Sequence, residues 1–181
     1  MDIKNMVNDI RLLVEDECKK DSNAFGYGIW SHHIVYVIKF GRILAEKLGA
    51  DKEIVEISAL LHDLAGIKNK EIHDQHHLYG AQEAERILSG YGYPAEKIER
   101  VKKCILSHRG SVDSERLSPE EICVTSADAM AHIDQMVSLL YYVYHKCGLN
   151  IDDGKLWVKD KLVRSWSKLC PEAKEIIRAI L

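Results

Sequence analysis

A histidine and an aspartate stand side by side as His62 and Asp63, and their types and position could support chemistry. The apolar run of residues 57–61 that precedes them is typical of a buried helix. Burying an imidazole or a carboxylate without a partner costs free energy, so both groups need a partner. Because the last turn of a helix can tighten, two adjacent side chains there can point toward one cation. His62 and Asp63 are therefore candidates for metal binding.

Four more polar side chains lie on the apolar faces of other predicted helices. Each has apolar neighbours four, seven or eleven positions away, which a period of 3.6 residues brings to the same side. A single inward histidine is most often a core residue with a hydrogen-bond partner, but a buried aspartate is rare unless it is paired or bound to metal. The four residues are His33, His77, His108 and Asp128. With His62 and Asp63 they place polar groups on the inner faces of five helices.

The elements that must position these side chains are all predicted to be helices. Apolar residues recur at intervals of three and four positions along the chain, and no sustained alternation of apolar and polar residues indicates a strand. Asp51 can cap one helix, and Ser118 opens a capping box with proline at the next position. The predicted helices cover about residues 2–19, 29–48, 52–65, 76–88, 94–108, 118–144, 155–169 and 172–181. We therefore expect an all-α, single-domain fold without internal repeats.

Length and composition exclude several classes of protein. The chain has 181 residues, of which 46% are hydrophobic, and 25 basic and 28 acidic side chains give a net charge of −3. This balance is not that of a disordered chain, and it argues against a dedicated nucleic-acid binder. The least broken apolar stretch, residues 136–144, is far shorter than the roughly 18 residues that span a bilayer. With no basic and apolar leader at the N-terminus, we expect a cytoplasmic protein that does not enter the membrane.

Two local features of the composition remain. Five cysteines, none closer than 19 positions to another, exclude a CxxC motif and favour reduced, mostly buried thiols. Residues 155–181 hold seven basic side chains against three acidic ones. A solvated helical face is the ordinary explanation of that excess, and a surface that attracts anions is the alternative.

The order and spacing of the polar residues resemble those of the HD-domain metal-dependent phosphohydrolases. Their signature is a histidine on an early helix, a His-Asp pair about thirty residues later, and a distant aspartate, all on one helical bundle. Here His33 precedes His62 by 29 residues, and Asp128 follows Asp63 by 65. Members that hold two metals have two further histidines in between. His77 and His108 resemble these.

The resemblance covers about residues 29–135 and implies an architecture and a metal site. The whole chain, residues 1–181, would be one HD-like helical domain, with the helices of residues 148–181 packed on the core. The implied ligands are His33, His62, Asp63 and Asp128 for one ion, and His77 and His108 for a second ion, with Asp63 bridging the two. Mixed imidazole and carboxylate ligands suit Mn, Fe, Co, Ni or Zn better than Mg, and we expect Mn or Fe.

The implied activity is hydrolysis of a phosphoester or phosphoanhydride bond in a nucleotide or another small metabolite. Two ions would hold a bridging hydroxide as the nucleophile and stabilise charge on a phosphoryl oxygen, so Asp63 counts as catalytic. Arg109 is the candidate phosphate clamp because a guanidinium matches two phosphate oxygens, although a charge favoured by the helix end is its alternative role. His32 and His76 precede implied ligands, and we expect them on the surface or beside a ligand.

Two other functions stay open on the same residues. The ligand set can house a di-iron centre that activates oxygen, as in some relatives, or it can stabilise a non-catalytic regulatory module. The sequence also leaves open whether the chain forms a homodimer.

Overall fold

The structure, a computed structural model, describes residues 2–109 and 118–180. Within these ranges the secondary structure is helical and contains no strand, which confirms the predicted all-α class. The elements are α1 (Ile3–Lys19), the π-helical turn η1 (Trp30–Ile34), α2 (Val35–Leu48), α3 (Lys52–Leu61), α4 (Leu64–Lys68), the 3₁₀ helix η2 (Lys70–Gln75), α5 (His76–Gly90), α6 (Ala95–Ser107), α7 (Pro119–Asp134), α8 (Met136–Tyr141), the π-helical turn η3 (Tyr142–Lys146), α9 (Ile151–Lys168) and α10 (Pro171–Ile180).

The predicted capping residues fix the starts of two helices that carry the site. Asp51 accepts hydrogen bonds from the backbone N–H groups of Glu53 and Ile54 at the start of α3. Ser118 accepts one from Glu121 at the start of α7, with Pro119 in the first turn. These bonds satisfy amide groups that the helix itself leaves without partners.

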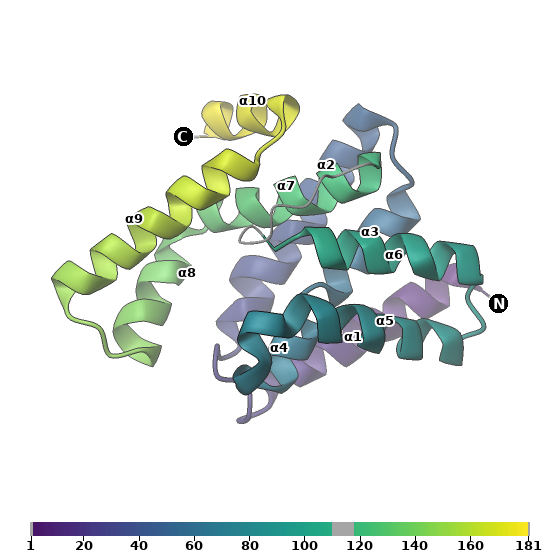
Figure 1. Cartoon of the computed structure of the whole chain (residues 1–181), viewed down its shortest axis with the longest axis horizontal. Coiled ribbons are helices and arrows are strands. Elements are labelled where there is room, and N and C mark those ends of the chain that lie inside the picture. Colours follow the sequence, from purple (N-terminus) through teal and green to yellow (C-terminus); the bar gives the residue numbers. More distant parts are fainter. Residues whose placement is uncertain (1, 110–117, 181) are drawn as a thin grey trace.

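The main core lies where α2, α3 and α7 meet, and α5 and α6 pack beside it (Figure 1). Helix α7 is buried along almost its whole length, from Cys123 to Ala131. Gly41 of α2 lies at this crossing, since a Cβ there would approach Val55 Cγ1 at 3.0 Å and Ala127 Cβ at 3.8 Å. The absence of a side chain at Gly41 thus lets three helices approach closely.

The predicted helix over residues 118–144 is wrong as a single element. The chain leaves the helical conformation at Gln135 (φ −103°, ψ 38°), so α7, α8 and η3 follow one another as separate pieces. The apolar periodicity continues through the break because the residues before it and the residues after it pack into two different hydrophobic clusters. Side chains of α7 face the main core, whereas Leu139 and Val143 pack with Val158 of α9 in a second, smaller cluster.

The C-terminal helices return to the bundle. Helix α9 packs against α7 and α8, and α10 contacts α7 and α2 (Figure 1). Helix α9 begins at Ile151, earlier than predicted, because the Asn150 side chain accepts a hydrogen bond from the N–H of Asp153. Among the helices of the described residues, none combines the length and apolarity needed to cross a bilayer.

Candidate metal centre and its pocket

Six histidine and aspartate side chains from separate elements meet at one place in the bundle. They form two groups in which the possible ligand atoms all lie within 4.8 Å of one another. One group is His33 on η1, His62 at the end of α3 and Asp128 on α7, and the other is Asp63, His76 on α5 and His108 after α6.

Asp63 joins the two groups. Its Oδ2 lies 3.3 Å from His33 Nε2 and 3.2 Å from His62 Nε2, and its Oδ1 lies 3.4 Å from His76 Nε2 and 3.6 Å from His108 Nε2. The Asp63 side chain keeps 23% of its surface exposed, so it can be reached from solvent, whereas Asp128 is only 5% exposed.

Two of the histidine rings are held by backbone carbonyl groups. Nδ1 of His62 donates to Ala59 O at 2.9 Å, and Nδ1 of His108 donates to Ile105 O at 2.5 Å. When Nδ1 carries the proton, the neutral ring presents the Nε2 lone pair to the cluster. Nε2 of His33 lies 3.2 Å from that of His62, and Nε2 of His76 lies 3.0 Å from that of His108. Lone pairs that converge beside carboxylate oxygens fit a transition-metal cation.

The charges around the cluster keep its carboxyl groups ionised. Burial by itself would raise the pKa of Asp63, but the neighbouring histidines, His62 first among them, hold the pKa well below the usual range. Burial likewise opposes ionisation of Asp128, whose pKa is held low chiefly by the Lys168 ammonium group. The cluster therefore offers two anionic ligands.

The pKa values of two cluster histidines shift in opposite directions. Burial lowers the pKa of His108 to about 4, so this ring is neutral near pH 7. Burial also opposes protonation of His62, but the Asp63 carboxylate outweighs it and raises the pKa of His62 to about 9. A proton and a metal ion compete for the same lone pair, so metal binding would displace this proton.

Two residues that the sequence did not single out hold Asp128 in place. His132 Nε2 lies 3.2 Å from Asp128 Oδ1 and stacks on the His33 ring, with centroids 4.5 Å apart. Lys168 donates to Asp128 Oδ2 at 3.0 Å and to the carbonyl oxygen of His108 at 2.9 Å. The spacing of His132, four residues after Asp128 on one helix, was a signal that could have identified it.

The structure brings five of the six predicted residues together and places His77 elsewhere. His77 is buried, as its periodicity predicts, but it does not line the pocket, and its Nδ1 has no hydrogen-bond partner among the described residues. His76, the preceding residue, contributes its imidazole to the cluster instead. The reason is visible at Gly80, four residues later, where a Cβ would lie 3.4 Å from the carbonyl oxygen of His62. The face of α5 that holds His76 and Gly80 therefore faces the end of α3.

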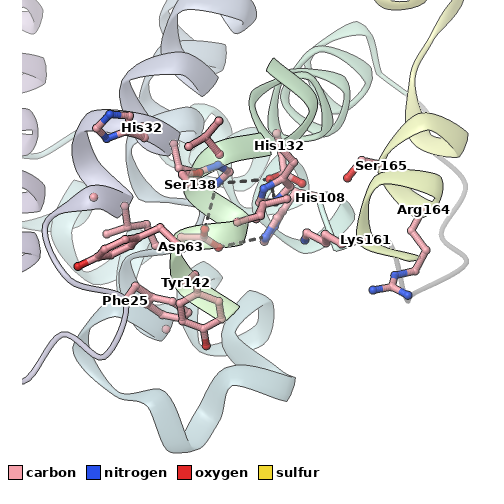
Figure 2. Close-up of a pocket in the computed structure, with 18 of the residues that line it drawn as sticks. Phe25, His32, Asp63, His108, His132, Ser138, Tyr142, Lys161, Arg164 and Ser165 are labelled. Atoms are coloured by element: carbon pink, nitrogen blue, oxygen red, sulfur yellow. Dashed lines mark ion pairs between the residues drawn. The ribbon is translucent and has the colours of Figure 1, made fainter. Parts of the chain in front are cut away.

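A cavity of about 970 Å³ opens over the cluster (Figure 2). One part of its wall is aromatic, because Phe25 lies 5.5 Å from Tyr142 and Tyr142 lies 6.1 Å from Trp157 between ring centroids. Helix α9 supplies another part, and Lys161 points from it toward the cluster in Figure 2.

The cavity is positively charged in a chain whose net charge is negative. Four basic side chains line it against two carboxylates, which leaves +2 when the histidines are neutral. The basic residues are Arg109, Lys161, Arg164 and Lys168, and the carboxylates are Asp63 and Asp128. The last three basic residues belong to the local basic excess of residues 155–181. Such a cavity attracts anions.

Arg109, the candidate phosphate clamp of the sequence analysis, lines the cavity. Its guanidinium group pairs with Asp74 at 3.1 Å, and Asp74 is 92% exposed. An ion pair with so exposed a carboxylate is weak. It uses one nitrogen of the guanidinium group, Nη2, as the donor.

The comparisons with known proteins agree with this geometry. A family model described as HD domain matches residues 30–133. Ribonuclease Y of Petrotoga mobilis is 33% identical over 112 residues, which are 62% of this chain and 20% of that protein. The chain thus spans only a fifth of the length of this relative.

Solved structures share the fold over nearly the whole chain. Bacillus subtilis YpgQ has a TM-score of 0.73 at 23% identity, covering 99% of this chain and 89% of that one. The same protein in complex with ADP has a TM-score of 0.66 at 23% identity, with coverage of 93% and 86%. A protein described as a predicted HD superfamily hydrolase, from an uncultured Thermotogales bacterium, has a TM-score of 0.59 at 21% identity, with coverage of 85% and 83%.

Proposed function

This chain belongs to the HD-domain family, and on that premise we propose that it is a divalent-metal-dependent phosphohydrolase that cleaves a phosphoester or phosphoanhydride bond of a nucleotide. The observation that carries the proposal is the convergence of six histidine and aspartate side chains, with their lone pairs turned inward, beneath a cavity of positive charge. Such a donor set suits Mn, Fe, Co, Ni or Zn.

We assign the residues of the cluster and Arg109 to separate roles. The first ion would be held by His33, His62, Asp63 and Asp128, and the second by Asp63, His76 and His108. When bound, divalent ions would lower the pKa of water toward neutrality and stabilise negative charge on a phosphoryl oxygen. Arg109 would bind oxygens of the phosphate group, since among the described residues its planar guanidinium donates to Asp74 alone.

A nucleotide is the proposed substrate because the cavity combines cations with an aromatic wall. The rings of Phe25, Tyr142 and Trp157 offer flat apolar surface for a base, and α9 offers charge for phosphate. The complex of YpgQ with ADP, a structure of the same fold, supports this choice. Since α9 completes the cavity, the proposal treats residues 148–181 as part of one domain with residues 29–135.

The test is phosphate release by the full chain. We expect the protein loaded with Mn²⁺, Co²⁺ or Ni²⁺ to release phosphate from members of a panel of nucleotides and aryl phosphates. Asp63→Asn keeps the shape of the side chain but removes the charge that links both ion sites. Its turnover should fall by more than the roughly 100-fold that loss of an outer partner of a metal ligand costs.

The matched control is Asp16→Asn, which makes the same substitution on the exposed face of α1. This variant should keep wild-type turnover, and far-UV circular dichroism should show equal helicity for all three proteins. A fully metal-loaded wild type that cleaves no compound of the panel would contradict the proposal. Oxygen uptake by the iron-loaded protein without phosphate release would favour the oxygen-activating alternative.

A further inference from the structure

One face of α9 runs along the cavity and lies outside the part of the chain that the HD-domain model matches, residues 30–133. Each residue that α9 contributes to the wall has another three or four positions away, as one helical face requires. They are Trp157, Lys161, Arg164, Ser165 and Lys168. This face therefore belongs to a part of the chain that the family model does not cover.

The three basic residues of this face have different partners. Lys168 is committed, because it donates to the Asp128 carboxylate and to the carbonyl oxygen of His108. The side chains of Lys161 and Arg164 make no hydrogen bond or ion pair with any of the described residues. Lys161 is half-buried, and burial is the main reason that its pKa is lowered. The Asp128 and Asp63 carboxylates raise its pKa, but less than burial lowers it, and among the described residues neither forms an ion pair with it. An anion in the cavity that contacts the Lys161 ammonium group directly would therefore stabilise it further.

The order of these residues along α9 gives the cavity a direction. Lys168 marks the end at the metal cluster because it bonds a cluster carboxylate. At 1.5 Å per residue, Arg164 lies about 6 Å and Lys161 about 10 Å farther along the helix axis, followed by Trp157 at about 16 Å. The Lys161 side chain points back toward the cluster, and Arg164 lies on the same face of α9. Two cations that have no hydrogen-bond or ion-pair partner among the described residues therefore line the cavity between the cluster and the aromatic wall.

We propose that Lys161 and Arg164 bind a second phosphoryl group of the substrate, so that the cavity selects compounds with two adjacent phosphoryl groups over monophosphates. The inference rests on the proposed function in one respect, which is that the first phosphoryl group lies at the metal cluster. Arg164 suits this task because a guanidinium can donate to two phosphate oxygens at once.

The test compares the binding of ADP and AMP by isothermal titration calorimetry in EDTA, so that neither metal nor turnover contributes. The two compounds share the nucleoside and the first phosphate, so the ratio of their affinities isolates the second phosphate. We expect the wild type to bind ADP about tenfold or more tightly than AMP, the effect of one charge-assisted contact. In Lys161→Met and in Arg164→Met this ratio should fall to about threefold or less, with AMP affinity nearly unchanged.

Two further variants make the result specific. Lys159→Met removes the same charge from the exposed side of the same helix, outside the cavity, and should keep the wild-type ratio. Lys161→Arg restores a cation and should keep most of the ratio. Equal affinity of the wild type for ADP and AMP would overturn the inference. The inference would also be overturned if Lys161→Met lowered the affinities for ADP and AMP by the same factor, or if Lys159→Met lowered the ratio of the two affinities.

The outcome separates this inference from the proposed function. If the ratio behaves as expected but no phosphate is released in the metal-loaded assay, only the hydrolase proposal falls. If phosphate is released but the wild type binds ADP and AMP equally, only the role of Lys161 and Arg164 falls.

Discussion

At the scale of single residues, the two carboxylates of the cluster are held in different ways. One oxygen of Asp63 faces His33 and His62, the other faces His76 and His108, and the side chain is partly exposed to the cavity. Asp128 is deeply buried, and both of its oxygens have protein partners, His132 and Lys168. Asp63 is thus suited to contact what enters the cavity, and Asp128 to remain fixed.

The neighbouring residues His76 and His77 provide a direct test of the proposed ligand set. We expect His76→Ala to weaken Mn²⁺ binding by at least about tenfold, because the variant removes an imidazole from the cluster itself. His77→Ala removes the same group one position away, outside the cavity, and should keep wild-type affinity for the metal. Calorimetric titration of Mn²⁺ into each folded variant measures both. Loss of binding in His77→Ala with retention in His76→Ala would contradict the assignment.

At the scale of elements, the start and the end of α3 are both tied to the site. His62 and Asp63 directly follow the last residue of the helix, and its N-cap residue Asp51 belongs to a network with α6 and α7. The backbone N–H of Asp51 donates to Glu120 Oε1 at 2.9 Å, and Arg100 pairs with both carboxylates, at 3.4 Å and 3.0 Å. The network fixes where α3 begins relative to the helices that carry His108 and Asp128.

The cap of α3 leads to a prediction about stability. Asp51→Ala removes the oxygen that accepts from Glu53 and Ile54, and we expect it to lower the free energy of unfolding by about 1–2 kcal/mol. Asp51→Asn keeps a capping oxygen and loses only the charge, so it should cost clearly less. Urea unfolding followed by circular dichroism gives both values. An equal loss in the two variants would mean that the charge, and not the cap, supports this end of α3.

The π-helical turn η1 is the second element with a direct effect on the site. It replaces the first turn of the predicted helix over residues 29–48 and carries His33. A π turn fits extra residues into the helix and changes the direction of the side chains that follow, and such turns are frequent at functional sites. Here it accompanies the placement of His33 against His62 and His132.

At the scale of the whole molecule, the cluster exists only because helices distant in sequence close on one another. The same closure makes a positive cavity in a chain with a net charge of −3, since most of the acidic side chains lie outside that cavity. Several of these acids stabilise the fold through ion pairs between elements. Glu83 on α5 is the clearest case, because it pairs with Arg86 on its own helix and with Lys68 on α4.

Glu83 makes the stability of the molecule depend on pH. Its hydrogen bonds with Arg86 first, and then with Lys68, lower its pKa to about 2 in the folded state, against about 4.3 in an unfolded chain. A depressed pKa stabilises the fold above the unfolded value, and this contribution is lost as the pH falls from about 4 toward 2. Glu83→Gln should therefore reduce stability at pH 7 and pH 5 by about 1 kcal/mol or less, since its partners are largely exposed.

The check is urea unfolding of the wild type and Glu83→Gln at pH 7, 5 and 3. The difference between the two proteins should be equal at the two higher pH values and smaller at pH 3. A difference that stays constant down to pH 3 would show that the ion pairs do not cause it.

The sequence alone determined the helical class, the capped starts of α3 and α7, and most of the side chains that turn inward. Helical periodicity and local caps depend on residues within one or two turns, so the helices around Asp51 and Ser118 could be predicted from short windows. The same periodicity placed His33, His62, His108 and Asp128 on inner faces, and the resemblance to the HD-domain family, now confirmed by the family match, grouped them.

Only the tertiary structure decided which inward residues meet. His76 and His77 both belong to a buried stretch, and the choice between them depended on the close approach of Gly80 to the end of α3. The break at Gln135 and the arrival of Lys161 and Lys168 at the cavity were equally hidden, because they depend on how α9 packs against α7 and α8. Periodicity states that a side chain is turned toward the interior, but its neighbours there come from other segments of the chain, and only packing brings those segments together.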